Sequence, residues 1–120
     1  MSLRANISKE GDVTILELHG KLNFENQAEL RANLVEILQS GKQVVVDLNG
    51  LDFIGSSGVT NFIQTVREVS QETGLTPRFC NVSREFKKIM QAFRIQQDSI
   101  HESRAEATKS FFRTGENERN

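Results

Sequence analysis

Apolar side chains near the start of the chain recur in a pattern typical of β-strands. Residues 13–18, VTILEL, are rich in apolar and β-branched side chains and predict a strand. Residues 3–7 form a weaker strand candidate, and residues 9–12, KEGD, favour a turn that would join the two strands as a hairpin. The apolar run 44–48, VVVDL, is too short for a helix and is typical of a strand buried on both faces. We expect it at the centre of a sheet, followed by a turn at Asn49-Gly50.

Three longer segments carry apolar residues at helical spacing. The first covers residues 26–40, with Asn23 as a candidate N-cap, and the second covers about 58–73. The third begins after Ser83, which is another candidate N-cap. The apolar positions that define these helices are Leu30, Leu34, Ile37 and Leu38, then Val59, Phe62, Ile63, Val66 and Val69, then Phe86, Ile89, Met90 and Phe93.

The remaining elements are shorter. A strand is expected from Arg78, because Pro77 is tolerated at the start of a strand and not in its middle. Residues 98–101 predict a short edge strand, and residues 104–112 predict a last helix. The polar residues 113–120 are expected to form a flexible tail.

The order of these elements predicts the fold class. Strands that alternate with helices produce a mainly parallel sheet with right-handed crossovers. We therefore expect one α/β domain over residues 1–112, with a mainly parallel or mixed sheet of four to five strands and about four helices. In such sheets the functional crevice lies beyond the carboxyl ends of the strands, where loops lead into helices. The stretch 52–59, DFIGSSGV, occupies a loop of this kind.

Composition narrows the classes of function. The chain has 120 residues, a formal net charge of -1 and one cysteine, Cys80. The near-neutral charge gives no reason to expect nucleic acid as a partner, and the apolar runs are too short for membrane insertion. A lone cysteine forms no internal disulfide, which agrees with a reducing compartment. With no apolar run long enough for a membrane, we expect a cytoplasmic protein. No spacing of Cys, His, Asp and Glu resembles a metal site, and no cofactor is expected.

Two adjacent serines, Ser56 and Ser57, precede the second predicted helix. One serine oxygen is enough to cap the helix by accepting a hydrogen bond from a free backbone N–H group. Its neighbour then has a hydroxyl to display, and the positive end of the helix dipole would favour a phosphate on it. Local capping and a phosphorylation switch are both consistent with these residue types.

Other chemistries fit the serine stretch less well. The glycines of residues 55–58, GSSG, flank two residues, whereas a hydrolase nucleophile elbow needs three, and neither His19 nor His101 has the placement of a catalytic base. No Gly-Lys-Ser/Thr sequence follows, so a nucleotide-hydrolysing phosphate loop is not supported. A module that binds a small anion or nucleotide through free helical N–H groups stays open as an alternative.

The stretch 44–59, VVVDLNGLDFIGSSGV, resembles the signature of the STAS domain, and of the anti-sigma-factor antagonists in particular. Residues 20–23, GKLN, resemble the first conserved loop of that family, and the order of elements matches over residues 3–112. The resemblance implies a non-enzymatic bacterial protein with a STAS-like fold that controls transcription by partner switching. Its partner would be an anti-sigma factor that is also a serine kinase, and a phosphatase would reverse the modification.

Carried over by position, the resemblance implies that Ser56 is the phosphoacceptor, that Ser57 caps the helix and that Gly58 opens it. The partner-binding loop would comprise Asn23, Gly55, Ser56, Ser57 and Gly58. Gly55 and Asn23 depart from the family, which usually has Asp at both positions. Two outcomes follow: a kinase that tolerates the neutral loop, or an antagonist that stays unmodified and binds constitutively.

A further alternative is a constitutive STAS subunit of another assembly, in stress signalling or lipid transport. Phe111 and Phe112 would then form a docking patch. The sequence does not predict the oligomeric state.

Overall fold

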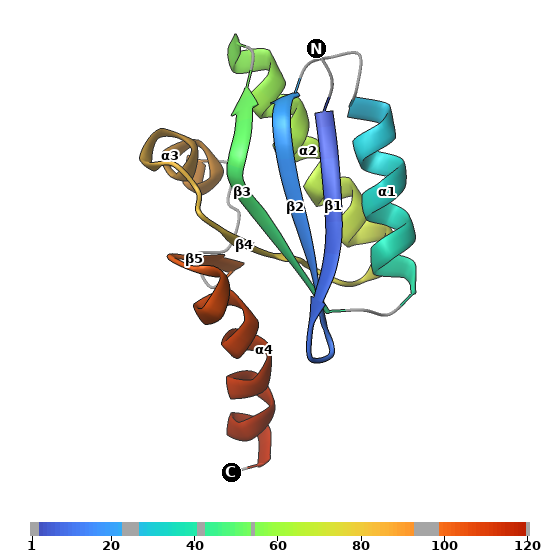
Figure 1. The fold of residues 1–120 in the computed structure, drawn as a ribbon, viewed down its shortest axis with the longest axis vertical. Helices are drawn as coiled ribbons and strands as arrows, with labels where there is room; N and C mark the ends of the chain where they lie inside the picture. Colours follow the sequence, from blue (N-terminus) through green and yellow to red (C-terminus); the bar gives the residue numbers. More distant parts are fainter. Residues whose placement is uncertain (1–2, 23–26, 41–42, 54, 93–98, 120) are drawn as a thin grey trace.

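The fold is that of a computed structural model, which describes residues 3–22, 27–40, 43–53, 55–92 and 99–119, with the backbone alone at 53, 55–59, 85 and 113–119. Figure 1 shows strands and helices alternating along most of the chain. In chain order the elements are β1 (Leu3–Glu10), β2 (Val13–Leu22), α1 (Gln27–Gln39), β3 (Gln43–Phe53), α2 (Gly55–Thr73), β4 (Arg78–Cys80), α3 (Arg84–Ala92), β5 (Ile100–His101) and α4 (Arg104–Arg119).

The strands form one mixed sheet in the order β1-β2-β3-β4-β5. β1 and β2 are the predicted antiparallel hairpin, and Gly11 in its turn has a φ of 62°, a conformation that glycine adopts without strain. The other three pairings are parallel. Each of these parallel pairs is joined through a helix, as the α/β pattern requires. The predicted fold class is therefore confirmed.

The two faces of the sheet are covered unequally. Alternate residues of β2, β3 and β4 point to a large core under α1, α2 and α3. The other face carries a smaller cluster, in which Ala107 and Phe111 of α4 cover part of the sheet. The strand residues of the large core are Leu16, Leu18 and Leu22, then Val44, Val46, Leu48 and Leu51, then Phe79. Those of the smaller cluster are Val13, Ile15, Val45 and Cys80.

The turn expected at Asn49-Gly50 is wrong, because β3 continues through this dipeptide to Phe53. The pairing with β2 shifts here: Glu17 lies opposite Asp47, whereas His19 lies opposite Gly50. β3 thus holds one more residue than β2 over this interval, as in a β-bulge. A glycine at this place lets the imidazole of His19 lie directly against the backbone, where a Cβ atom at residue 50 would collide with it.

This close approach gives a testable prediction. Replacing Gly50→Ala is expected to lower the free energy of unfolding by about 1–3 kcal/mol, because the added methyl group must displace the imidazole. In a His19→Ala background the same substitution should cost under about 1 kcal/mol. Urea denaturation of the four proteins measures this coupling. Equal costs in both backgrounds would show that the contact between His19 and Gly50 does not constrain the bulge.

Most helix signals in the sequence are confirmed. Ser83 caps α3, since its Oγ accepts a hydrogen bond from the backbone N–H of Phe86 at 3.2 Å. Ser103 caps α4 in the same way, because its Oγ accepts from the N–H of Glu106 at 3.2 Å. α4 continues past its expected end at residue 112 to Arg119. The assignment of residues 113–120 to a flexible tail stays a prediction.

Candidate functional site

The site begins where the two central strands end side by side. Leu22 of β2 lies opposite Phe53 of β3 in a parallel register. Both strands therefore reach the same edge of the sheet, at the top of Figure 1, where α2 begins. The chain leaves β2 directly before Asn23 and leaves β3 shortly before Ser56. Asn23 itself lies outside the described residues.

Gly55, Ser56, Ser57 and Gly58 all lie in the first turn of α2, which begins at Gly55. The expected cap at Ser57 and the expected opening of the helix at Gly58 are wrong, because an N-cap residue precedes the first helical residue. Two of these four residues are glycines and two are serines, which have low helix propensity, so the sequence favoured a later start. They also lack apolar side chains, so periodicity could not reveal that they are helical.

The first turn of a helix offers a particular electrostatic environment. Its leading backbone N–H groups have no partner within the helix, and they carry the positive end of the helix dipole. A negative group here is stabilised by about 0.3–1 kcal/mol at an exposed position. Ser56 and Ser57 both belong to this turn. A helix start of this kind favours a negatively charged group over a positively charged one.

α2 is held firmly behind this turn. Phe62, one turn further along, is 1 % exposed and packs against Phe79 and Phe86, with ring centroids at 6.4 and 5.7 Å. Arg31 of α1 also reaches α2, as its two terminal nitrogens lie 3.2 Å from Glu68 and 2.5 Å from Glu72. The start of α2 is thus presented by a helix that is packed on three sides.

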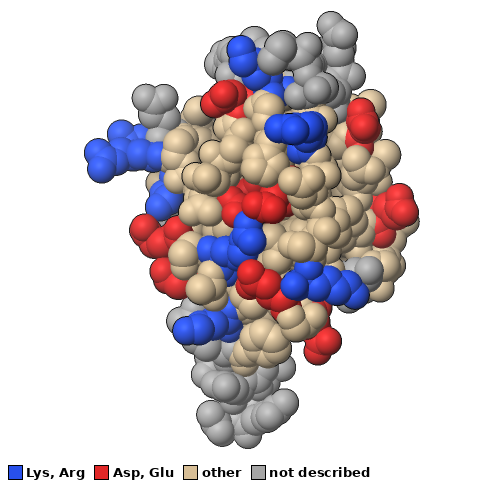
Figure 2. Space-filling view, viewed as in Figure 1, with Lys and Arg blue, Asp and Glu red and all other residues tan. Residues whose placement is uncertain are grey.

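A polar network on the other face of the sheet was missed by the sequence analysis. Arg104, the first residue of α4, lies 2.7 Å from a carboxylate oxygen of Glu17 and 2.8 Å from one of Asp47. Asp47 also accepts hydrogen bonds from the side-chain amide of Asn81 at 2.9 Å and the backbone N–H of Asn49 at 3.0 Å. Figure 2 looks onto this face and shows acidic and basic side chains interspersed over it. The network fastens α4 to the sheet.

The network changes the ionisation of its members. Burial raises the pKa of Asp47, but hydrogen bonds from Asn81, Arg104 and Asn49 outweigh it, so that the pKa lies below its ordinary value of 3.8. Burial, with the neighbouring charge of Asp47, raises the pKa of Cys80 to about 12. Cys80 is therefore a buried thiol at neutral pH.

One local signal could have revealed the network. Asp47 interrupts the apolar run of the central strand, and it is only 5 % exposed. A carboxylate buried in this way needs charged or hydrogen-bonding partners. The apolar run around Asp47 therefore predicts that this carboxylate has a partner. It does not identify Arg104, which lies 57 residues further along the chain.

The described parts of the chain give little support for a catalytic histidine, a metal site or a membrane span. His19 lies inside β2 against Gly50, and His101 lies in β5. No three His, Cys, Asp or Glu side chains among the described residues are arranged to hold a metal ion. Within the same residues, no helix combines the length and apolarity needed to cross a membrane.

Comparisons with known proteins agree with the geometry. A family model described as the STAS domain matches residues 4–107. Among solved structures, an anti-sigma factor antagonist from Mycobacterium paratuberculosis has a TM-score of 0.70 at 14% identity, over 91% of this chain and 93% of its own. RsbS from Moorella thermoacetica has a TM-score of 0.72 at 12% identity, over 94% of this chain and 98% of its own.

The Bacillus protein SpoIIAA in its phosphorylated form has a TM-score of 0.63 at 18% identity, covering 88% of this chain and 97% of its own. No curated protein matches the sequence significantly. Structural similarity at such low sequence identities shows only that the fold is shared. The family model, in contrast, matches most of the sequence. The chain therefore belongs to the STAS domain family.

Proposed function

We propose that this protein is a non-enzymatic anti-sigma-factor antagonist that binds an anti-sigma factor with serine kinase activity. The partner-binding surface comprises Asn23, Gly55, Ser56, Ser57 and Gly58. Phosphorylation of Ser56 ends the binding, and a phosphatase restores it. The protein thereby regulates transcription by exchanging partners.

The observation that carries this proposal is the placement of the serines in the first turn of α2, next to the carboxyl end of β2. A protein docked at this edge of the sheet would contact the chain after Leu22 and the start of α2 together. A phosphate on Ser56 would add roughly -1.5 to -2 of charge and three acceptor oxygens to that contact. Such a change alters docking without unfolding the helix, because the helix dipole favours negative charge there.

The proposal predicts different behaviour of two substitutions. Ser56→Asp is expected to weaken binding of the anti-sigma factor from the source cell by about tenfold or more, because it places a charge in the contact. Ser56→Ala should leave binding nearly unchanged. Isothermal titration with the purified partner measures both affinities. Ser8→Asp is the matched control, since Ser8 is exposed on β1 and away from the carboxyl ends of the central strands.

Two results would contradict the switch. The first is equal binding by Ser56→Asp and Ser56→Ala, and the second is an equal loss with Ser8→Asp. Incubating the protein with the partner and ATP, followed by mass spectrometry, tests the modification itself. A phosphate on Ser56 is expected, whereas an unmodified loop in a tight complex would indicate constitutive binding.

A further inference from the structure

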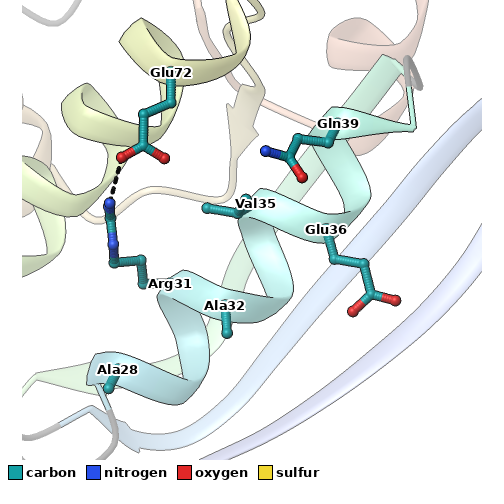
Figure 3. A pocket seen from close by; sticks show the side chains of 7 residues that line it. All are labelled: Ala28, Arg31, Ala32, Val35, Glu36, Gln39 and Glu72. Carbon is teal, nitrogen blue, oxygen red and sulfur yellow. Dashed lines mark hydrogen bonds and ion pairs between the residues drawn. The ribbon is translucent and has the colours of Figure 1, made fainter.

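A groove runs between α1 and α2 on the side away from the sheet. It has a volume of about 570 Å³. Figure 3 shows the side chains that line it, including Ala28, Ala32 and Val35 of α1. These three residues are spaced as i, i+4 and i+7, so they form one apolar stripe along the helix. Two alanines in the stripe allow another helix to approach the backbone of α1 closely.

Acidic side chains flank this stripe. Glu72 of α2 lies on one side and is held by Arg31, with the two groups drawn together in Figure 3. Glu36 of α1 points away from α2 in the same view. Among the described residues, Glu36 makes no ion pair. The groove therefore presents an apolar strip with an unneutralised carboxylate at its edge, which would attract a cation.

The outer side of α4 has the complementary pattern. Ala107 and Phe111 face the sheet, whereas Ala105, Lys109 and Phe112 are exposed. These three exposed residues also follow the spacing i, i+4 and i+7, with Phe112 49% exposed. Lys109 makes no ion pair within the described residues. Because these residues are exposed, this side of α4 is available to another molecule. Figure 1 shows α4 extending beyond the sheet.

Within one chain, the α1–α2 groove and the outer side of α4 face in different directions. α4 packs on the smaller cluster of the sheet, whereas α1 and α2 cover the opposite face. The α4 helix of one molecule thus meets the groove only in a second molecule. We propose that the protein associates with itself by seating α4 of one copy in the α1–α2 groove of another.

In this contact, Phe112 and Ala105 lie against the apolar stripe, and the cation of Lys109 meets Glu36. The mode is that of an amphipathic helix in a groove, with apolar contacts from Ala105 and Phe112 at i and i+7 and a charged contact from Lys109 at i+4. A reciprocal pair fills both grooves at once. The proposal is independent of Ser56 and of any other partner.

The test exploits the opposite charges of the two residues. Light scattering of the full chain at up to about 1 mM is expected to show a mass that rises with concentration. Lys109→Glu and Glu36→Lys are each expected to weaken this association by about tenfold or more, because each sets like charges against each other. An equimolar mixture of the two variants should associate again, because each α4 then meets a groove of the opposite charge.

Lys88→Glu provides the matched control, since it makes the same change at an exposed position of α3 and should leave the association intact. Circular dichroism establishes that each variant is folded. A wild-type chain that stays monomeric over the whole range overturns the proposal. So does association that Lys109→Glu leaves unchanged, or a mixture that fails to recover it.

Discussion

Phe62→Ala is expected to lower the free energy of unfolding by about 3–5 kcal/mol, the largest effect foreseen for a single substitution in this chain. The ring of Phe62 is 1% exposed and contacts Phe79 of β4 and Phe86 of α3. Its removal leaves a cavity where three elements meet, and the rigid core closes such a cavity only in part. Urea denaturation followed by circular dichroism measures the loss.

Phe112→Ala is the matched control, because Phe112 has the same side chain and is 49% exposed. It should cost under about 1 kcal/mol when measured at a concentration too low for self-association. If the two substitutions cost the same, Phe62 does not hold α2 in the way its contacts indicate. The comparison also bears on the site, because Phe62 anchors the helix that presents Ser56.

Arg104→Met is expected to lower the free energy of unfolding by about 2–3 kcal/mol at pH 7. The substitution keeps the apolar stem of the side chain but removes the cation from Glu17 and Asp47. Asp47 would stay buried with a charge that only Asn81 and a backbone N–H then stabilise. Chemical denaturation measures the cost, and Arg31→Met is the control.

Arg31 contacts two carboxylates, as Arg104 does in its two shortest ion pairs. The partners of Arg31 are more exposed, because the side chains of Glu68 and Glu72 are 49% and 46% exposed. Exposed ion pairs contribute little, so Arg31→Met should cost about 1 kcal/mol or less. An equal loss in the two variants would mean that burial of Asp47 does not set the strength of the network. The control thus separates the effect of burial from the effect of losing a cation.

The contribution of Asp47 also has a defined pH dependence. Its pKa in the folded protein lies below the ordinary value of 3.8, so the stabilisation is fully present above that value. It is lost as the pH falls through the lower folded pKa, where the carboxylate becomes protonated. The difference in stability between the wild type and Arg104→Met should therefore shrink on acidification below 3.8. A difference that stays constant would rule out this carboxylate as its source.

Local patterns were sufficient for most of the fold. The alternation of short apolar strands with helical periodicities predicted the hairpin, the parallel strands and all four helices, because each element buries one side in a regular period. Ser83 was correctly placed as a cap, since a cap depends on residues within three positions of it. The stretch over residues 44–59 indicated the family, which the family model confirmed. The candidate site that the same stretch indicated stays a prediction.

The errors came from positions where a distant residue decides the local structure. Asn49-Gly50 has the composition of a turn, but pairing with β2 keeps it in the sheet, and the side chain of His19 lies against Gly50. α2 begins at Gly55, although the glycines and serines of residues 55–58 carry no helical signal. Propensity is a weak guide where tertiary packing opposes it.

The sequence by itself determined the order of strands and helices, the fold family and the position of Ser56 near the start of a helix. These features depend on residues close together in the chain, whose spacing is visible in the sequence. Only the tertiary structure decided that Arg104 meets Asp47, that β2 and β3 end side by side, and that α1 and α2 form a groove opposite to α4. Such contacts join residues far apart in the chain, because they arise when whole elements pack together and not from any local period.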